Sequence, residues 1–280
     1  ATIHEINTLR KHLSRFSGGS LVRAAFPATV LGLIVSDVVG DDLDVIASGP
    51  TVPDPSTFAD CLRVVEHYGL RWKMPQSIWA HIEGGLQGRT PETPKADEPA
   101  FGRVRNVLVA SVKQALEAAA DEAARCGFVP RILTTAMSGE ARRTAAQLVA
   151  EARRAQAGLR PGDAPLCLLA GGETTVTIRG SGKGGRNQEM ALAATLELAD
   201  DRGIDLICVG TDGTDGPTDA AGGYAFSGDL ARLRAIGLHP KESLDANDSY
   251  PLLLKAGTLL RTGPTRTNVM DMTIMLVRPK

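Results

Sequence analysis

Apolar residues along the chain fall into two kinds of segment, which predict strands and helices in alternation. Short runs that are apolar at nearly every position are typical of strands buried on both faces of a sheet; they span 29–35, 104–110, 128–135, 166–170, 205–209 and 269–277. Longer segments with apolar residues three or four positions apart predict helices; they span 56–68, 75–83, 111–126, 139–157, 227–236 and 250–260, and another follows Gly185. This alternation predicts an α/β sandwich with a largely parallel sheet. The β-prone run 174–178 and the C-terminal strand are expected to add antiparallel or mixed edges.

The first helix is predicted to begin almost at once, because Thr2 and Glu5 have the spacing of a capping box. One side of this helix is an apolar stripe, which we expect to be buried: Ile6, Leu9, Leu13 and Phe16. The other side is a row of hydrogen-bond donors: Asn7, Arg10, Lys11 and Ser14. Such a row is either a solvated face or a ligand-binding face, and we keep Arg10 and Lys11 as binding candidates.

The segment from Gly84 to Gly102 is rich in glycine and proline with scattered charges, which is typical of a linker. It divides the 280 residues into a first domain, 1–83, and a second domain, 103–280. The total length suits one large domain or two of ordinary size.

The composition is that of a globular protein and argues against several function classes. Hydrophobic residues make up 43%, while a net charge of −1 and 4% aromatic residues do not favour binding to nucleic acid or to a membrane surface. No apolar run reaches the ~18 residues of a membrane span, and no signal-peptide pattern opens the chain. The four cysteines form no metal-binding spacing and three lie in apolar segments, so we expect buried thiols and a reducing, cytoplasmic location.

The most informative stretch is Cys167–Met190. Here an apolar run stops at Gly171-Gly172, and four of the six residues in 180–185, the glycine-rich loop, are glycine. Glycine reaches φ > 0 without strain and lets backbone N–H groups crowd around a ligand. Lys183 lies in this loop and Arg186 opens the next helix, whose N-terminus favours anions. The stretch therefore predicts a site for a phosphate or a carboxylate, with plain surface charge as the alternative.

Two nucleotide-binding patterns can be compared with the glycine-rich loop. Gly180-x-Gly182-x-x-Gly185 formally matches the dinucleotide fingerprint, but the run before it is less apolar than a central first strand. The Walker A pattern fails, because the loop lysine is followed by glycine. NAD(P) binding stays as the weaker alternative.

Carboxylates follow two of the predicted strands. Asp37 and Asp41 come after 29–35, and Asp212 and Asp215 come after 205–209. Ligands of α/β proteins bind at the carboxyl ends of strands, so these side chains are candidates for holding a metal ion or activating a hydroxyl. Ordinary turn chemistry of aspartate is the alternative. A weaker set of donors precedes the last strand: Thr265 and Asn268.

Six segments, in order along nearly the whole chain, resemble those of the class II glycerate 2-kinases, whose C-terminal domain is called MOFRL. They are Glu5–Ser14, Ser36–Asp41 with Val45–Thr51, Ser138–Arg142, Gly171–Thr175 with Gly182–Glu189, Gly210–Gly216, and Gly263–Asp271. The resemblance implies a Rossmann-like first domain and a MOFRL-type second domain, with the active site in the cleft between them. It also implies a kinase that phosphorylates D-glycerate to 2-phosphoglycerate with ATP and Mg²⁺. Members of the family are often labelled hydroxypyruvate reductase.

The family pattern includes an upstream region with a catalytic lysine and a Gly-Ser-rich loop. We therefore expect this chain to hold the back part of the first domain and the whole second domain. We also expect negligible kinase activity from these 280 residues without that N-terminal segment as a partner.

Residue chemistry within these segments gives the site candidates. The catalytic candidates are Arg186, Asp212 and Asp37, and the candidate Mg²⁺ ligands are Asp37, Asp41 and Asp212. The candidates for binding glycerate or nucleotide are Lys183, Gly171, Gly172, Glu173, Gly182, Gly184, Gly185, Asn187, Glu189, Asp215, Arg10, Lys11, Thr265 and Asn268. The alternative activity is NAD(P)-dependent reduction of hydroxypyruvate, and the non-enzymatic alternative is a fragment that binds ligand without turnover. A homodimer is left open.

Overall fold

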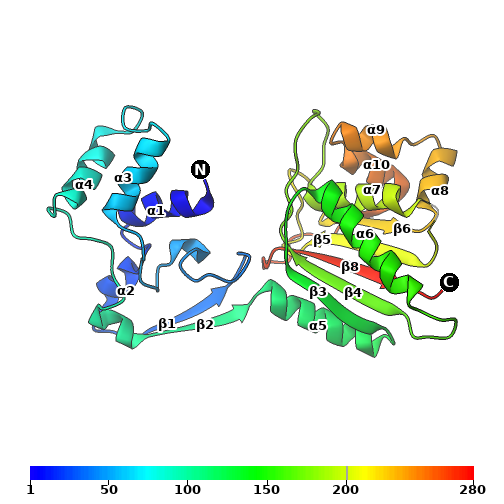
Figure 1. The fold of residues 1–280 in the computed structure, drawn as a ribbon, viewed down its shortest axis with the longest axis horizontal. Helices are drawn as coiled ribbons and strands as arrows, with labels where there is room; N and C mark the ends of the chain where they lie inside the picture. Colours follow the sequence, from blue (N-terminus) through cyan, green and yellow to red (C-terminus); the bar gives the residue numbers. More distant parts are fainter. Residues whose placement is uncertain (200) are drawn as a thin grey trace. The chain divides into compact units, whose positions relative to one another are not determined.

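Residues 1–199 and 201–280 are described by a computed structural model, in which they form two units (Figure 1). Unit 1 comprises Ala1–Ile34 and Asp41–Val109, and unit 2 comprises Val35–Gly40 and Ala110–Lys280.

Unit 1 consists of helices α1 to α4, two short 3₁₀ helices and two paired strands. Their bounds are α1 Ile3–Leu13, α2 Ser20–Ala25, β1 Val30–Val35, η1 Ile46–Ser48, α3 Phe58–His67, α4 Gln76–Leu86, η2 Pro99–Arg103 and β2 Val104–Ala110. The predicted capping box is confirmed: Thr2 Oγ1 accepts a hydrogen bond from Glu5 N (3.3 Å), and the Glu5 carboxylate accepts one from Thr2 N (2.6 Å). Helices α1, α3 and α4 enclose a small core: Phe58, Cys61, Val65 and Ile82.

Helix α1 buries Asn7 and Lys11 of its polar side, and of the apolar stripe only Leu9 packs against the core, so most of the predicted orientation is wrong. Leu13 and Phe16 are 42% and 65% exposed, whereas Asn7 and Lys11 are 3% and 4% exposed. The reason is that the polar groups have partners: Lys11 Nζ lies 3.4 Å from a carboxylate oxygen of the buried Asp54. Buried polar groups that are paired in this way can replace apolar contacts.

The segment 84–102 is not a free linker, because it packs within unit 1. Lys95 donates from Nζ to the backbone oxygen of Asp54 (3.1 Å), and Arg23 forms an ion pair with Glu98. Strand β2, which the prediction placed in the second domain, pairs with β1. The division between the units therefore falls at Val109/Ala110, and the prolines and glycines before it mark an irregular but fixed segment.

Strand β1 confirms the predicted strand at 29–35, but it is not buried on both faces. Its residues alternate, and Leu31 and Leu33 are 61% and 67% exposed. One face of the two-stranded sheet is thus covered within unit 1, and the other is exposed.

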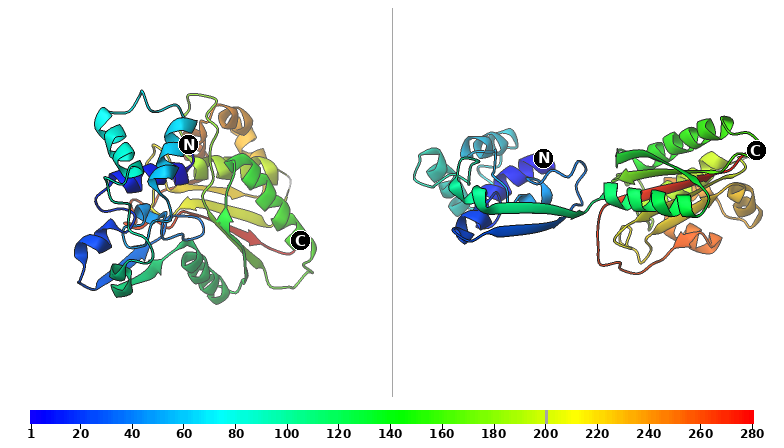
Figure 2. Two further views of the ribbon diagram at one scale, coloured as in Figure 1. Left: turned by 60° about the vertical axis from the view of Figure 1, so that its left-hand side comes forward. Right: turned by 90° about the horizontal axis from the view of Figure 1, so that it is seen from below.

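Unit 2 is built on a six-stranded sheet with helices on both faces (Figures 1 and 2). Its elements are α5 Val112–Arg125, β3 Val129–Met137, α6 Ala141–Ala157, β4 Leu166–Gly172, α7 Arg186–Leu198, β5 Ile204–Gly210, β6 Gly222–Phe226, α8 Asp229–Ala235, α9 Pro240–Asp245, α10 Ser249–Ala256, β7 Leu259–Leu260 and β8 Asp271–Val277. Along β4, Leu166, Leu168 and Ala170 join the core under α6 and α7, while Cys167 and Leu169 join the core under α5. This alternation explains why β4 is continuously apolar.

The α/β class is confirmed, but the sheet is mixed. Its order is β3-β4-β8-β5-β6-β7; β3 and β4 are parallel, and every other pairing described in this sheet is antiparallel. Strands β3, β4, β5 and β7 do run in one direction, which is the parallel character that the strand–helix alternation predicts. The C-terminal strand β8, expected at an edge, lies instead in the middle, between β4 and β5.

The run 174–178 does not form a strand, contrary to the prediction; only Thr175 makes an isolated bridge, to Glu140. The prediction also missed α2, α9, β6 and β7, which are short or lack an apolar run. The expected burial of three thiols is confirmed, because Cys61, Cys167 and Cys208 are buried and only Cys126 is exposed. Across residues 1–199 and 201–280, no helix is both long and apolar enough to span a membrane.

Candidate active site

The candidate site lies where three strands of unit 2 end or begin side by side. In the register of the sheet, Asp271 at the start of β8 pairs with Gly172 at the end of β4 and with Gly210 at the end of β5. The loops that follow β4 and β5 therefore begin at the same edge of the sheet. These two loops therefore come together within unit 2.

Arg186 is the first residue of α7, and two carboxylates hold its guanidinium. Nε and Nη2 form a fork on Asp271, at 2.5 and 3.0 Å, and Nη1 donates to Glu173 at 2.6 Å. Asp271 is buried and Glu173 is exposed, so one side of the guanidinium is anchored and the other is accessible. Burial lowers the pKa of Arg186, but the hydrogen bond to Asp271 and the charges of Asp271 and Glu173 raise that pKa above its usual range. The cation is fixed in place and permanently charged.

The N-terminus of α7 is capped by a carboxylate of the chain itself. Asp215 accepts hydrogen bonds from the backbone N–H groups of Asn187 (3.0 Å) and Gln188 (2.8 Å), and from their side-chain amides. Burial raises the pKa of Asp215 above its usual range, although these hydrogen bonds act to lower it. The prediction that the start of α7 binds an anion from a ligand is therefore wrong for these two N–H groups, because Asp215 already occupies them. The geometry gives Asp215 a capping role, and Asn187 is one of the residues that it caps.

The glycine-rich loop is held by residues that follow α9. Asn247 Oδ1 accepts hydrogen bonds from the N–H groups of Arg179 (2.7 Å) and Gly180 (3.0 Å). Asp248 Oδ1 accepts one from the N–H of Lys183 (2.9 Å). The loop is thus fixed by a segment more than sixty residues away in the sequence.

The glycines of the loop serve close backbone contact rather than left-handed conformations. None of Gly180, Gly182, Gly184 and Gly185 has a positive φ. A Cβ atom at Gly182 would lie 2.5 Å from the Asp248 Cβ, and one at Gly184 would lie 2.2 Å from the Ser249 Oγ. Close packing therefore explains why glycine occupies these positions. The predicted explanation, a backbone with φ > 0, is wrong.

Gly171 and Gly172 lie in β4 and serve packing. A Cβ at Gly171 would lie 2.3 Å from Val112 of α5, and one at Gly172, where φ is 145°, would lie 2.2 Å from the carbonyl oxygen of Met137. Both are buried, so the geometry does not place them as ligand-binding residues. The dinucleotide fingerprint also loses its basis here, because no strand leads into Gly180-x-Gly182-x-x-Gly185.

A cavity of about 510 Å³, which we call the loop cavity, lies within unit 2 beside Arg186. It is lined by Glu173, Thr174, Thr175, Val176, Ile178, Gly182, Gly184, Gly185, Arg186, Glu189, Gly216, Pro217 and Asn247. Thr174 is 2% exposed, and its hydroxyl has no hydrogen-bond partner among the described residues. The N–H groups of Gly184, Gly185 and Arg186 also have no acceptor within 1–199 and 201–280. The cavity therefore presents unpaired donors next to a fixed cation.

Glu189 connects the wall of the loop cavity to α6. It is 2% exposed, and its carboxylate accepts hydrogen bonds from Arg142 Nε (2.7 Å) and from Asn247 Nδ2 (2.9 Å). Arg142 also donates to the backbone oxygen of Leu244 (2.6 Å). Both carboxylate oxygens of Glu189 are thus engaged, so it positions Asn247, and through Asn247 the glycine-rich loop.

The loop after β5 is fixed by turn hydrogen bonds. Asp212 accepts hydrogen bonds from Thr214 N and Thr214 Oγ1, both at 2.9 Å, which is the turn alternative raised for this aspartate. Thr265 N donates to the backbone oxygen of Asp212 (3.0 Å), and Thr265 Oγ1 donates to that of Thr211 (2.6 Å). Asn268 caps its own turn, with Oδ1 accepting from Met270 N (3.0 Å). The half-buried Asp212 still has free lone pairs for a ligand.

Lys183 is exposed and lies over an aromatic ring. Its Nζ is 4.3 Å from the centroid of Tyr250, whose hydroxyl donates to Asp219 (2.6 Å) and accepts from Arg261 (2.6 Å). The ring restrains the lysine without neutralising its charge.

Four predicted site residues lie in the N-terminal part of the chain, and the two basic ones already have partners. Lys11 is enclosed between Asp54 and Asp44, so it is not free to bind a ligand. Arg10 is exposed but donates to Asn7 (3.0 Å). The remaining two are Asp37, which is exposed, and Asp41, which is half-buried with φ 59°.

Metal ligands do not gather in the described part of the chain: no group of three His, Cys, Asp or Glu side chains there could hold an ion. The candidates Asp37, Asp41 and Asp212 do not form such a group. Magnesium commonly uses one or two carboxylates together with substrate phosphates, so this does not remove single candidates.

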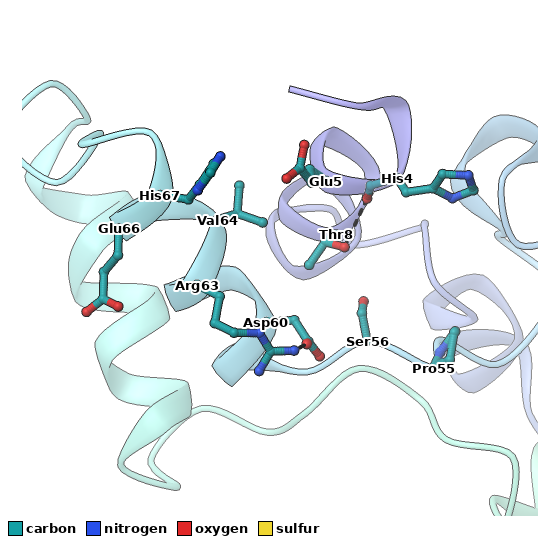
Figure 3. Close-up of a pocket in the computed structure, with 10 residues that line it drawn as sticks. All are labelled: His4, Glu5, Thr8, Pro55, Ser56, Asp60, Arg63, Val64, Glu66 and His67. Carbon is teal, nitrogen blue, oxygen red and sulfur yellow. Dashed lines mark hydrogen bonds and ion pairs between the residues drawn. The ribbon is translucent and has the colours of Figure 1, made fainter.

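A larger hollow of about 910 Å³ lies in unit 1 between α1 and α3 (Figure 3). Two of its carboxylates are engaged by their own helices: Asp60 caps α3 through Thr57 and pairs with Arg63, and Glu5 caps α1. Figure 3 shows these side chains along the two helix faces, with Ser56 and Pro55 on the connecting segment. It is an interhelical groove, and among the described residues none of those lining it carries a buried side-chain group without a hydrogen-bond partner, as Thr174 does in the loop cavity.

Sequence reasoning missed Asp271, Arg142, Asn247 and Thr174 as site residues. Asp271 and Arg142 end two of the segments that carried the family resemblance, so a signal was present. Asn247 stands in an ordinary polar turn, and its role is visible only from its contacts with the glycine-rich loop.

Comparison with known proteins gives a consistent result. The MOFRL family model matches residues 166–271, and a domain of unknown function (DUF4147) matches residues 1–83. The glycerate 2-kinase of Pyrococcus horikoshii is 47% identical over 100% of this chain, and the D-glycerate 2-kinase of Thermotoga maritima is 44% identical over 99% of it. In both cases the chain spans 63% of the relative's length.

The glycerate kinase of Macaca fascicularis is 38% identical over 100% of this chain, which covers 80% of that relative. The crystal structure of glycerate kinase from Thermotoga maritima matches with a TM-score of 0.89 at 44% identity, over 99% of this chain and 64% of that one. The family predicted from six sequence segments is thereby confirmed: the chain belongs to the class II glycerate kinases.

Proposed function

We propose that the protein phosphorylates D-glycerate at its 2-hydroxyl, with ATP as the phosphate donor. The observation that carries this proposal is Arg186, a cation anchored by Asp271 beside a cavity with three consecutive unpaired N–H groups. Membership of the glycerate kinase family supports the choice of acceptor and donor.

Phosphoryl transfer depends on positioning and on stabilising charge at the transferred group, and the protein needs to supply little covalent chemistry. Asp271 and Glu173 use three of the five N–H donors of Arg186, so two are left for phosphate oxygens. Because Asp271 fixes the guanidinium before substrate binds, little reorganisation is needed during the reaction. Lys183 adds a point charge at the edge of the loop.

Asp212 is the carboxylate we propose for orienting the 2-hydroxyl or for holding Mg²⁺. Its oxygens accept hydrogen bonds from Thr214 alone, so each has a further lone pair for a proton or a cation. Magnesium, when bound, would neutralise charge on the phosphates of ATP. Asp37 and Asp41 stay as proposals for the same task.

The test is a coupled ADP assay on the full-length gene product, with D-glycerate and with L-glycerate, and with and without Mg²⁺. We expect ADP release that requires D-glycerate, and a product that enolase consumes directly, as 2-phosphoglycerate would be. In parallel, hydroxypyruvate and NADH are supplied and NADH absorbance is followed. NADH oxidation without glycerate-dependent ADP release would replace the kinase by the reductase.

A further inference from the structure

The loop cavity is much larger than glycerate. At about 510 Å³ it falls in the range of roughly 300–1,000 Å³ typical of sites for cofactors and drug-sized ligands. A three-carbon hydroxy acid would leave most of this space to water. Its size therefore suits a nucleotide.

The lining of the cavity has two kinds of surface. One kind suits an anion: the unpaired N–H groups of Gly184, Gly185 and Arg186, together with the Arg186 guanidinium. The other kind is apolar: Val176, Ile178 and Pro217. Ile178 is 80% exposed, which is ordinary for a single residue but here adds to a shared apolar wall. Glycerate carries an oxygen on every carbon and has nothing to match that wall.

Thr174 supplies an independent sign of a ligand. Its side chain lines the cavity and is 2% exposed, yet its hydroxyl has no partner among the described residues. A buried hydroxyl without a hydrogen bond is costly, and a ligand in the cavity would relieve that cost.

We propose that the loop cavity is the nucleotide subsite of the enzyme, an inference that rests on the proposed function. The polyphosphate of ATP or ADP binds at Gly184–Arg186, the base covers Val176, Ile178 and Pro217, and the Thr174 hydroxyl makes one hydrogen bond to the nucleotide. D-Glycerate then binds outside this cavity and receives the phosphoryl group near Arg186.

The experiment measures KM for ATP and KM for D-glycerate separately in the full-length gene product, and the affinity for ADP and for inorganic tripolyphosphate by calorimetry. Thr174→Val keeps the shape of the side chain and removes an unpaired hydroxyl, so we expect no loss of thermal stability. Ile178→Ser alters an exposed residue of the apolar wall. The matched control is Ile236→Ser, at the end of α8, where the side chain is 57% exposed and does not line the cavity.

We expect Thr174→Val and Ile178→Ser each to raise KM for ATP and Kd for ADP about 3- to 10-fold, as one lost contact would. KM for D-glycerate and both constants of Ile236→Ser should not change, and Ile178→Ser should leave tripolyphosphate affinity intact. A raised KM for D-glycerate with unchanged ADP affinity would overturn the assignment, as would ADP affinity that neither variant alters. If the protein shows no kinase turnover, the ADP titrations still decide the subsite, so the two proposals fail separately.

Discussion

A cation held by carboxylates occurs in both units, and the two arrangements differ in access. In unit 1, the Lys11 side chain is 5% exposed and pairs with Asp54, whose side chain is 0% exposed. In unit 2, the Arg186 side chain is 36% exposed and lies between the buried Asp271 and the exposed Glu173. The first pair is closed on all sides, whereas the second leaves one edge of its cation facing a cavity.

The difference follows from the shape of the two cations. An ammonium is a point charge, and carboxylates on several sides exhaust it. A guanidinium is a planar fork, so one edge can be anchored by Asp271 while the other binds a substrate oxygen. Whether a cation next to carboxylates is structural or functional therefore depends on how many of its N–H donors remain without an acceptor. The exposed fraction of its side chain alone does not decide between the two roles.

Lys11→Met is expected to have the largest effect, because it leaves the Asp54 carboxylate buried without its cation. Breaking such a pair costs roughly 3–5 kcal/mol in the free energy of unfolding. Both tryptophans, Trp72 and Trp79, are in unit 1, so urea unfolding followed by tryptophan fluorescence reports on this unit.

The control for that variant is Lys73→Met, an exposed lysine of the same unit, with an expected change within about 0.5 kcal/mol. If Lys11→Met costs less than about 1 kcal/mol, the buried pair does not stabilise unit 1 and the comparison fails.

Arg186→Lys is expected to act on catalysis instead of stability. It keeps the charge but loses the fork on Asp271, so kcat should fall by roughly 10²-fold or more, as for loss of a preorganised donor. Arg232→Lys is the matched control, since Arg232 also forks onto a buried aspartate, Asp229, away from the cavity. A raised KM for ATP at normal kcat would move Arg186 from transition-state stabilisation to ground-state binding.

The smallest effect is expected from pH, and it has opposite signs at the two buried aspartates. Burial raises the pKa of Asp54, but hydrogen bonds from Ser56 and the charge of Lys11 outweigh it and hold that pKa below its usual range. Asp54 therefore stabilises unit 1 above its unfolded pKa of about 3.9, and this contribution is lost as the pH falls through the lower folded pKa. Asp54→Asn should flatten the acid limb of unit 1 stability, measured by tryptophan fluorescence. An unchanged acid limb would mean that Asp54 is not the group that titrates.

Asp215 supplies the contrast. Its pKa is raised, so its contribution to the stability of unit 2 is complete below the unfolded pKa and is lost as the pH rises through the folded pKa. The Asp215 carboxylate thus stabilises unit 2 only below its raised folded pKa, while the paired Asp54 stabilises unit 1 above its unfolded pKa.

Local pattern was sufficient for most elements of unit 2, because α5, α6, α7 and the strands β3 to β5 each carry their own periodicity. It failed where a contact from elsewhere decides the outcome. The polar side of α1 is buried only because Asp54 and its neighbours meet it, and the sequence of α1 alone does not contain that information. The run 174–178 has strand propensity, but only Thr175 forms a bridge, to Glu140. Asn247 binds the backbone that follows the run.

The site shows the same limit. The sequence drew attention to Arg186 and to the glycine-rich loop, because charge and glycine stand together there. It could not show that Asp215 closes the start of α7, or that the glycines serve contact with Asp248 and Ser249, since both depend on pairings of distant segments.

The central position of β8 affects how unit 2 folds while it is synthesised on the ribosome. β4 and β5 are joined in the sheet only through β8, which is synthesised after all the other strands. At roughly 5–20 residues per second, the half-sheet β3–β4 has an unpaired edge for roughly 5–20 s before β8 is synthesised, whereas β5–β7 is complete only about a second before it. The same strand begins with Asp271, so the anchor of Arg186 arrives in the step that closes the sheet. A nascent unit 2 therefore gains its fold and its fixed cation together, and until then it depends on whatever shields exposed strand edges in the cell.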